Sequence, residues 1–466
     1  MHGKSNYFNE DTIVALSGAL GGAIATVRFS GKNSLQILSK LTGKSTQEFI
    51  PRVATRSNLF NQNKNKIDDS VVVFFQNPNS FTGEDSVEIS IHASAYIAQT
   101  LISEIIKLGG RQALPGEFSF RAVRSGKITL DQAQAIPELI ESKNQTAAEL
   151  ALEKMSGLQN KWVKEVSAQL RQSAMLSEIG IDFSDQDIEE LELKRLKEQV
   201  KDILPKLEQV EKSFERGKQI QNGVPTAIIG MPNAGKSSFF NLLLGEDRSI
   251  VSEIAGTTRD VVRESITLKN ESKSATLRLS DTAGIRKSVD QIESLGIEKS
   301  KNAASESELV ICVVDSKNPE INQVKKILED ITQVNKRVVI VLNKSDLVNK
   351  EECKKLLELF SNICTIEPVF VSSQTGRGID EVISVILKAI SDKVIRAPGE
   401  LVLTHINHLN AIRQSKEDLR RAINAPEYEL FAADIRQCLA HLSGLIGETS
   451  TDDILGKLFS EFCIGK

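Results

Sequence analysis

The segment that most constrains the fold of this chain is a glycine-rich stretch near its middle. Residues 230–237 read Gly-Met-Pro-Asn-Ala-Gly-Lys-Ser and match the pattern G-x-x-x-x-G-K-[ST]. The stretch follows an apolar run, Thr226–Ile229, and precedes a helical pattern, which is the context that the motif requires. Glycines let backbone N–H groups surround phosphate oxygens, and a helix N-terminus favours their negative charge. The stretch therefore predicts an α/β domain with a phosphate-binding loop.

Around this loop, over residues 222–390, short apolar strands alternate with helices. Such alternation predicts a doubly wound, mainly parallel sheet that is covered on both faces. The predicted strands are Thr226–Ile229, Thr276–Leu279, Leu309–Val314, Val338–Leu342 and Pro368–Val371.

The chain on either side of this region has a helical pattern, over residues 129–215 and again after residue 400. In the first stretch, apolar residues recur mostly at three- and four-residue steps between dense Glu and Lys. This is typical of a bundle helix with one solvated face. A helical region is thus predicted to be interrupted by an α/β insert. The apolar stripe comprises Ile188, Leu191, Leu196, Val200, Ile203, Leu207, Val210 and Phe214.

Residues 11–125 are predicted to form a mixed α/β domain of their own. A helix is expected at Ala95–Leu108, ended by Gly109-Gly110, and the polar segment Arg56–Asp69 is expected to be a loop. The expected fold is therefore multi-domain, with an N-terminal α+β domain and an all-α bundle interrupted by a domain with a mainly parallel sheet. Strands of the first domain are expected at Ala23–Phe29, Val71–Phe75 and Val87–His92.

Composition excludes several classes of protein. The 466 residues suggest about three domains at roughly 150 residues each. The formal net charge of -4 excludes a chain held on nucleic acid by overall charge. The apolar runs are too short to span a bilayer, and residues 1–30 lack the pattern of a signal peptide, so no membrane is expected. The five cysteines are odd in number with none two residues apart, which argues against disulfides or a Cys-based zinc site and favours the cytoplasm.

Four further elements follow the loop in order and indicate a guanine nucleotide. Thr258, in Gly256-Thr257-Thr258-Arg259-Asp260, offers a hydroxyl to Mg²⁺ and the γ-phosphate. In the loop, the Ser237 hydroxyl would ligate Mg²⁺ and Lys236 would reach the β- and γ-phosphates. In Asp281-Thr282-Ala283-Gly284, Asp281 can hold the metal through water and the Gly284 N–H can contact the γ-phosphate. Asp346, in Asn343-Lys344-Ser345-Asp346, can accept both N1–H and the N2 amino group of guanine, a donor pair that adenine lacks. Ser372-Ser373 would complete the base pocket, so the domain is interpreted as a GTPase.

The residue that orients the attacking water is not the usual one. In Ras-like enzymes a Gln follows the glycine of the Asp-x-x-Gly element, whereas here that position is Ile285. Another group must orient the water and neutralise the developing charge. Arg286 could act as a built-in arginine finger, and Glu293 could activate water. The candidates in sequence order are Arg286, Lys287, Asp290 and Glu293.

The segments that flank the GTPase region carry a family resemblance. The GTPase motifs alone are shared with Era-like and Der-like GTPases. Residues 79–85, Asn-Ser-Phe-Thr-Gly-Glu-Asp, with Glu88, and residues 114–118, Leu-Pro-Gly-Glu-Phe, with Arg121-Ala122, resemble the N-terminal signature of the MnmE (TrmE) family of tRNA-modification GTPases. So do residues 131–135, Asp-Gln-Ala-Gln-Ala, and the last five residues, Phe-Cys-Ile-Gly-Lys. The resemblance covers the chain from about residue 10 to its end.

The resemblance implies a domain order and a reaction. The implied domains are an N-terminal folate-binding and dimerisation domain at 1–125, a helical domain in two segments at 126–217 and 389–466, and an inserted G domain at 218–388. The homodimer would act with the FAD-dependent partner MnmG (GidA), in a heterotetramer or larger complex, on the wobble uridine of certain tRNAs. It would add an aminomethyl-type or carboxymethylaminomethyl group to C5 of U34, with the one-carbon unit coming from a reduced folate, 5-formyl- or methylene-tetrahydrofolate. GTP hydrolysis would drive the domain rearrangement, with Mg²⁺ and K⁺ as its ions.

The resemblance also implies residue roles. Asn233 and the backbone of Ser252, Ile254 and Thr257 would bind K⁺ when two G domains meet, and the ion would do the work of an arginine finger. Glu293 would activate water, with Lys236 as the second catalytic residue. The folate-binding residues would be Arg28, Glu88, Lys127 and Lys466, and Cys463 would lie near the one-carbon chemistry. The nucleotide-binding residues would be Asn233, Ala234, Gly235, Lys236, Ser237, Ser238, Ser252, Glu253, Ile254, Ala255, Gly256, Thr257, Thr258, Asp281, Thr282, Ala283, Gly284, Asn343, Lys344, Asp346, Ser372 and Ser373.

Two other functions fit parts of the sequence. An Era/Der-like switch in ribosome assembly rests on the GTPase motifs alone, and it predicts a KH-like or second G domain that the sequence lacks. A folate-binding scaffold with a decayed GTPase is opposed by the presence of Lys236, Asp281 and Asp346.

Overall fold

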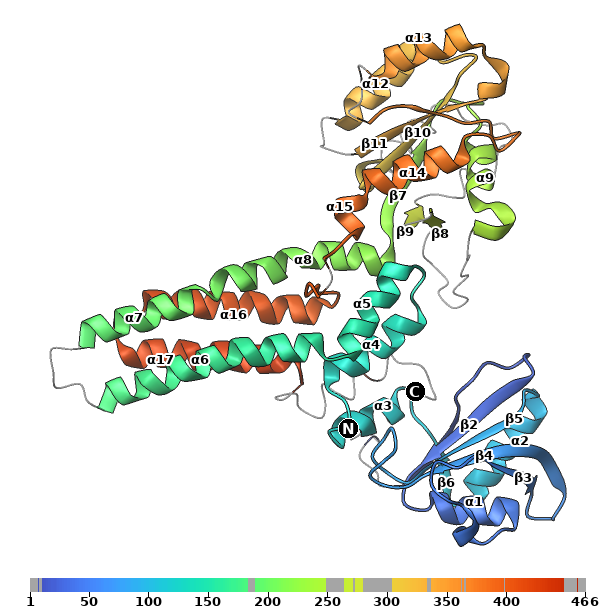
Figure 1. The fold of residues 1–466 in the computed structure, drawn as a ribbon, viewed down its shortest axis with the longest axis vertical. Coiled ribbons are helices and arrows are strands. Elements are labelled where there is room, and N and C mark those ends of the chain that lie inside the picture. The colour runs from blue at the N-terminus through green and yellow to red at the C-terminus, as the bar shows by residue number, and fades with distance from the viewer. Residues whose placement is uncertain are drawn as a thin grey trace, which may run out of the picture. The chain divides into compact units, whose positions relative to one another are not determined.

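The structure is a computed structural model of the chain (Figure 1). It describes residues 7, 11–182, 189–248, 264–270, 273–279, 304–332, 337–361, 363, 366–397, 399–447 and 459. The chain divides into two compact units, each built from separated segments. Unit 1 comprises Met1–Pro137, Lys154–Glu189 and Ala425–Lys466, and unit 2 comprises Glu138–Glu153 and Glu190–Asn424. The domain boundaries expected after residues 125, 217 and 388 stay predictions.

Unit 1 contains a six-stranded sheet in the order β3-β4-β5-β2-β1-β6. All neighbours are antiparallel except β1 and β6, which are parallel. Helices α1 (Ser34–Thr42) and α2 (Ala95–Lys107) bury Ile37, Leu101 and Ile105 in one core with the sheet residues Val27 and Ile89. The strands are β1 (Thr12–Leu16), β2 (Ile24–Ser30), β3 (Thr55–Phe60), β4 (Lys66–Phe75), β5 (Ser86–His92) and β6 (Gly110–Gln112), with a 3-10 turn at Thr46–Glu48.

The expected loop at Arg56–Asp69 is wrong, because this segment contains β3 and the start of β4. Its polarity has a structural reason. β3 lies at the edge of the sheet, and two inward positions of β4 are taken by the buried polar residues Asp68 and Ser70. Asp68 Oδ2 accepts hydrogen bonds from Ser70 Oγ at 3.2 Å and from the His92 backbone N–H at 2.9 Å. Because these hydrogen bonds satisfy the buried polar atoms, the strand needs no apolar residue there.

The helices of unit 1 come from both ends of the chain. α6 (Leu158–Asp182) packs along α17 (Tyr428–Leu445), a helix that lies far away in the sequence (Figure 1). Gln159 Nε2 donates to the Leu445 carbonyl at 3.3 Å, and Arg436 Nη1 donates to Glu178 Oε1 at 2.9 Å. The predicted interruption of a helical region is therefore confirmed. Helix α3 (Glu117–Arg124) also belongs to unit 1, α4 (Leu130–Ile140) crosses the boundary after Pro137, and α5 (Gln145–Met155) lies mainly in unit 2.

In unit 2, a second pair of long helices repeats this arrangement. α8 (Leu204–Asn222), which follows α7 (Glu189–Lys201), packs against α16 (Ile406–Asn424). The predicted stripe forms the contact face from Leu196 to Phe214, since every stripe residue in this interval is buried. Ile188 and the side chain of Leu191 lie outside the described part. None of the helices that the structure describes has both the length and the apolar character needed to cross a bilayer.

The second sheet is doubly wound, as predicted. Its order is β12-β11-β10-β7-β9-β8, and every neighbouring pair is parallel except β8 and β9. Residues of β10 alternate between two cores, with Ile311 and Val313 on the face of α9 and α14, and Cys312 on the face of α12 and α13. The elements are β7 (Val224–Ile229), α9 (Lys236–Arg248), β8 (Glu264–Lys269), β9 (Ser274–Leu279), β10 (Leu309–Asp315), α12 (Ile321–Thr332), β11 (Arg337–Asn343), a 3-10 turn at Ser345–Leu347, α13 (Lys350–Ser361), β12 (Val369–Phe370), α14 (Ile379–Ala389) and α15 (Ser391–Val394).

Helix α5 completes one core of this sheet, although it precedes the sheet by about seventy residues in the sequence. Its residues Ala147 and Leu150 are buried with Leu268 of β8 and Leu277 of β9. Asn144 begins the helix, because its Oδ1 accepts the Ala147 backbone N–H at 2.9 Å, while its Nδ2 donates to Thr276 Oγ1 of β9 at 2.9 Å. The sheet therefore depends on a helix from outside its own run of sequence.

Gly217 on α8 provides a first test of packing in unit 2. A Cβ at this position would lie 2.0 Å from the Leu403 carbonyl oxygen. Gly217→Ala is therefore expected to lower the free energy of unfolding by about 1–3 kcal/mol, measured by denaturant titration. The direction of the change in the free energy of unfolding separates two effects, because helix propensity alone would make alanine more stable than glycine by roughly 1 kcal/mol. Gly22→Ala is the control, since a Cβ at Gly22 would meet nothing within 4 Å; equal stability of the two variants would contradict the clash.

Candidate functional site

The predicted phosphate-binding loop lies between β7 and α9, as its sequence context requires. Its glycines allow close approach of other backbone and side chains. A Cβ at Gly230 would lie 2.2 Å from the Val313 carbonyl oxygen, and a Cβ at Gly235 would lie 2.3 Å from Asn343 Nδ2. Both glycines have positive φ, 151° and 87°, and so does Asn233 at 62°. The loop thus forms a cradle of backbone that other residue types would fill.

Lys236 is the first residue of α9 and folds back over the loop. Its Nζ donates to the carbonyl oxygens of Gly230 at 3.0 Å and Met231 at 2.9 Å. Burial lowers the pKa of Lys236, since the ammonium group is partly withdrawn from water. Ser237, one position further on, is half-buried, and the exposed Ser238 follows. A cation over the N-terminus of a helix suits a polyphosphate ligand, and a serine hydroxyl beside it suits Mg²⁺.

Asn343 connects the phosphate-binding loop to the predicted base pocket. Its Nδ2 donates to the Ala234 carbonyl at 3.0 Å, and its Oδ1 accepts from the backbone N–H of Ser373 at 3.0 Å and from Ser373 Oγ at 2.8 Å. The neighbouring Ser372 is buried, and its Oγ accepts the Thr375 backbone N–H at 3.3 Å. One buried amide therefore sets the distance between the loop and the segment after β12.

Lys344 continues this connection with its positive charge. Its Nζ donates to the Asn233 carbonyl at 2.8 Å and to Asp315 Oδ2 at 2.6 Å. Burial raises the pKa of Asp315, but hydrogen bonds from Lys344 Nζ and the Lys317 backbone N–H outweigh it and hold that pKa below its usual value. Asp346 lies in the 3-10 turn with an exposed side chain, so its carboxylate can accept hydrogen bonds from a base.

Part of the predicted nucleotide site lies outside the described residues. This applies to the segment from Ser252 to Thr258, with Glu253, Ile254, Ala255, Gly256 and Thr257, and to Asp281, Thr282, Ala283 and Gly284. It applies also to Ile285 and to the four candidates for orienting water, Arg286, Lys287, Asp290 and Glu293. Their roles remain predictions.

The N-terminal sheet brings two predicted folate-binding residues together. Arg28 of β2 and Glu88 of β5 are direct partners in the antiparallel register. Arg28 Nε and Nη2 both donate to Glu88 Oε1, at 2.9 and 2.6 Å. The guanidinium carbon of Arg28 lies 5.8 Å from the ring centroid of Phe81 and 5.9 Å from that of Phe118. Two aromatic rings therefore lie near the guanidinium, and the partly exposed one, Phe81, presents a surface that suits a planar ligand.

Lys127, the third of these residues, lines an open hollow of about 440 Å³ beside Phe81. Cations and aromatic rings line it together, which suits an anionic ligand with a planar part. Lys466 and Cys463 lie outside the described residues, so their predicted roles are untested. The lining of the hollow comprises Arg52, Phe75, Asn79, Ser80, Phe81 and Lys127.

Comparison with known proteins covers nearly the whole chain. Residues 12–127 match the family model described as the GTP-binding protein TrmE N-terminus, and residues 130–463 match the MnmE helical domain. A Bacteroides thetaiotaomicron protein named tRNA modification GTPase MnmE is 36% identical over 472 residues, which are 98% of this chain and 100% of that protein. The chain belongs to the MnmE (TrmE) family. The prediction of a GTP-hydrolysing enzyme with an N-terminal domain, a helical domain and a P-loop GTPase fold is thereby confirmed.

Further MnmE relatives show the same coverage. The Aquifex aeolicus protein of that name is 34% identical over 464 residues, 98% of this chain and 100% of its own.

A solved structure of the G domain of the T. maritima FeoB iron transporter covers 36% of this chain and 98% of its own length, at 26% identity and a TM-score of 0.24.

Residues that sequence reasoning missed lie beside both sites of this MnmE-family chain. Asp315, the partner of Lys344, ends β10 as Asn343 ends β11, so the rule that parallel strands end at one edge of a sheet could have found it. Arg52, which lines the hollow with Lys127, had no such signal, because its approach depends on how the loop before β3 folds back: its Nη2 donates to the Asn79 carbonyl at 3.0 Å.

Proposed function

We propose that this chain hydrolyses GTP as a subunit of a cytoplasmic complex that modifies C5 of the wobble uridine U34 in certain tRNAs. The added group is an aminomethyl or carboxymethylaminomethyl group, and 5-formyl- or methylene-tetrahydrofolate supplies its one-carbon unit. The observation that carries the proposal is 36% identity along 98% of the chain to a tRNA modification GTPase, because it includes the flanks as well as the nucleotide-binding region. The proposed assembly is a homodimer with the FAD-dependent partner MnmG, in a heterotetramer or larger complex.

The proposed division of labour follows the expected domains, at 1–125, 126–217 with 389–466, and 218–388. In the G domain, Lys236 contacts the β- and γ-phosphates, and Asp346 accepts the two donors of guanine. Ser237 and Thr258 hold Mg²⁺, which neutralises charge on the phosphate oxygens when bound. The cradle of backbone around Gly235 and the position of Lys236 Nζ over the loop support these roles.

In the N-terminal domain, Glu88 would accept the donor edge of the folate pterin. Arg28 and Lys127 would attract the folate carboxylates, with Lys466 as a fourth contact and Cys463 near the transferred carbon. The folate carries the one-carbon unit when bound. The support for this site is the Arg28–Glu88 pair beside Phe81 and the hollow that Phe81 shares with Lys127.

The proposal is tested by nucleoside analysis of tRNA from a strain that lacks the gene. The C5 modification of U34 is expected to disappear in this strain and to return when the gene is supplied on a plasmid. A plasmid that encodes the Lys236→Ala variant serves as the control, because the variant protein should be expressed yet fail to restore the modification. Unchanged U34 modification in the deletion strain would contradict the proposed function.

Asn233 gives a test of the proposed K⁺ dependence. Its side chain would bind K⁺ with the backbone of Ser252, Ile254 and Thr257, and Glu293 would activate the attacking water. GTP turnover is expected to be about tenfold or more higher in K⁺ than in Na⁺, because the ion adds positive charge beside the phosphates. Asn233→Gly should remove this difference while GTP still binds. Glycine is the right replacement, since Asn233 has a φ of 62° and alanine would add strain. Equal GTP turnover by the wild type in K⁺ and in Na⁺ would contradict the proposed role of Asn233 in K⁺ binding.

The alternative of an Era/Der-like ribosome-assembly switch is not supported by any specific observation. It would leave the matches at residues 12–127 and 130–463 to the two models of the MnmE family without an explanation.

A further inference from the structure

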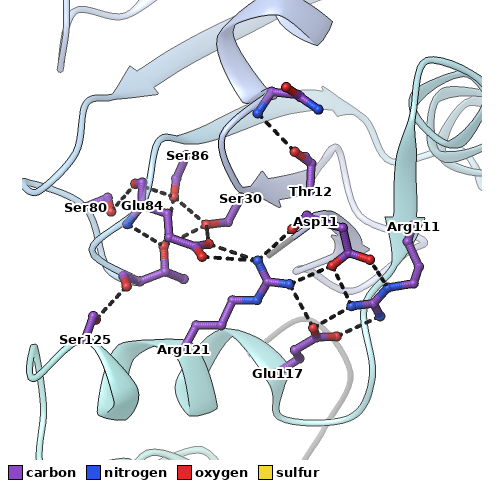
Figure 2. Close-up of polar contacts among 12 residues, drawn as sticks. Asp11, Thr12, Ser30, Ser80, Glu84, Ser86, Arg111, Glu117, Arg121 and Ser125 are labelled. Carbon is purple, nitrogen blue, oxygen red and sulfur yellow. Dashed lines mark hydrogen bonds and ion pairs between the residues drawn. The ribbon is translucent and has the colours of Figure 1, made fainter. Parts of the chain in front are cut away.

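A partly buried cluster of charges joins helix α3 to the start of β1 and to the loop between β4 and β5 (Figure 2). Arg121 of α3 is at its centre, with its side chain 4% exposed, and Glu117, one turn earlier, is fully buried at 0%. Arg121 Nη2 donates to Glu117 Oε1 at 3.0 Å and to Asp11 Oδ1 at 3.1 Å. Arg111 binds the same two carboxylates from the other side, with Nε donating to Asp11 Oδ2 at 2.7 Å and Nη2 to Glu117 Oε1 at 2.7 Å. The hydrogen bonds from Arg111 lower the pKa of Asp11.

The other face of the Arg121 guanidinium holds a different segment, the loop between β4 and β5. Arg121 Nη1 donates to Glu84 Oε2 at 3.1 Å and to the Asp11 carbonyl at 2.8 Å. Figure 2 shows the guanidinium between Glu84 on one side and Asp11 with Glu117 on the other. Glu84 is fixed in turn by Ser30, whose Oγ donates to Glu84 Oε2 at 2.9 Å. One side chain therefore ties the loop to helix α3 and to the start of β1.

The two elements that Arg121 joins carry the two rings that flank Arg28. Phe81 lies three residues before Glu84 in the loop, and Phe118 follows Glu117 on α3. Their centroids are 5.8 and 5.9 Å from the Arg28 guanidinium carbon. Phe118 is fully buried and packed in a core, whereas Phe81 is 38% exposed and lies on the loop between β4 and β5. The contact between Arg121 and Glu84 is thus one of the contacts that hold the loop on which Phe81 lies, together with hydrogen bonds from Ser125 Oγ to the Thr82 carbonyl and from Arg52 Nη2 to the Asn79 carbonyl.

We propose that Arg121 is a positioning residue for reduced folate, acting through Glu84 to hold Phe81 against Arg28 and beside the hollow that Lys127 lines. Arg121 does not touch the ligand. The inference rests on the proposed folate function of this site. Arginine is required because its planar fork reaches Glu84, Asp11 and Glu117 at once, whereas the single ammonium group of lysine cannot reproduce that geometry.

The test is calorimetric titration of the full-length protein with 5-formyl-tetrahydrofolate. The wild type should bind, and both Arg121→Lys and Glu84→Ala should raise the Kd about tenfold, because the ring beside Arg28 is no longer held. Glu84→Gln should stay within about threefold of wild type, since its amide oxygen still accepts from Arg121 and Ser30. The double variant Arg121→Lys with Glu84→Ala should bind no more than about threefold more weakly than Arg121→Lys, because both changes remove one contact.

Two controls separate positioning from general stability. Arg56→Gln removes the pair between Arg56, 81% exposed, and Asp69 in the same sheet, and should leave folate affinity unchanged. GTP turnover should be normal in every variant, because all of these residues belong to unit 1, whereas the phosphate-binding loop belongs to unit 2. Glu84→Ala decides the question if Arg121→Lys does not fold, since the Glu84 side chain is 33% exposed and water can replace its contacts.

The outcomes distinguish two failures. A wild-type protein that does not bind 5-formyl-tetrahydrofolate overturns the proposed folate function. Wild-type binding with an unchanged Kd in Glu84→Ala overturns only the role of Arg121. A Glu84→Gln variant as weak as Glu84→Ala also overturns that role, because it would show that the hydrogen bond from Arg121 is not what matters.

Discussion

Lys236→Ala is expected to lower GTP turnover by about 10²–10³-fold, the usual effect of removing one preorganised group that stabilises charge in a transition state. Lys236 Nζ already lies over the phosphate-binding loop, 3.0 Å from the Gly230 carbonyl and 2.9 Å from that of Met231. It needs little movement to meet a phosphate, so its charge is preorganised. The measurement is the rate of phosphate release at saturating GTP, with nucleotide affinity determined by calorimetry.

The fold should survive this change. Gly230 and Met231 are only half-buried, so water can bind the carbonyl oxygens that Lys236 leaves. Glu293→Ala is the matched comparison, because it should lower turnover without weakening nucleotide binding, whereas Lys236→Ala should weaken both. Normal turnover in Lys236→Ala with intact folding would show that phosphate charge is neutralised elsewhere.

Asp346→Asn is expected to weaken GTP binding by about 10²–10⁴-fold, through the loss of two charge-assisted hydrogen bonds of about 1.5–3 kcal/mol each. In the proposed base pocket the carboxylate would accept from both N1–H and the N2 amino group of guanine, whereas asparagine would present its own amino group to one of these donors. Xanthosine triphosphate has a carbonyl oxygen in place of that amino group, so the variant should bind it more tightly than GTP. Calorimetry with both nucleotides makes the comparison.

Because the Asp346 side chain is exposed, Asp346→Asn should change nucleotide binding without disturbing the fold. Its side chain packs against no core, so the free energy of unfolding should change by less than about 0.5 kcal/mol. Ser345→Ala, in the same 3-10 turn, serves as the control and should keep the wild-type preference for GTP. A variant that still prefers GTP would remove Asp346 from the base pocket.

The buried parallel strands could be predicted from sequence, because both of their faces need apolar residues and they form continuous runs such as Leu309–Val314. Strand β8 could not be predicted in this way, because it lacks a continuous apolar run. It is an edge strand, and among its residues whose burial the structure describes, two are fully buried, Ile266 and Leu268. The segment around Asp68 was missed because hydrogen bonds replace apolar contacts there.

The same distinction holds for the candidate sites. Asn343 and Lys344 were predictable, because they lie at the end of a buried strand in a pattern with known chemistry. The pairing of Arg28 with Glu88 depends on the register of two antiparallel strands, which no short motif encodes. The contact of Arg121 with Glu84 joins residues 37 positions apart through tertiary structure alone.

Helix α5 has a consequence for how far the GTP-binding region is an autonomous module. Ala147 and Leu150 lie in the same core as Leu268 and Leu277, and Val394 and Val402 close that core from beyond the other end of the sheet. A fragment cut at residues 218 and 388 lacks Ala147, Leu150, Val394 and Val402. Burial of one large apolar side chain stabilises a fold by about 1.5–3 kcal/mol. The sheet of this fragment would present an apolar face to water, where aggregation begins. The inserted GTP-binding region is therefore not an independent folding unit, and a version transplanted into another protein needs residues 144–155 attached.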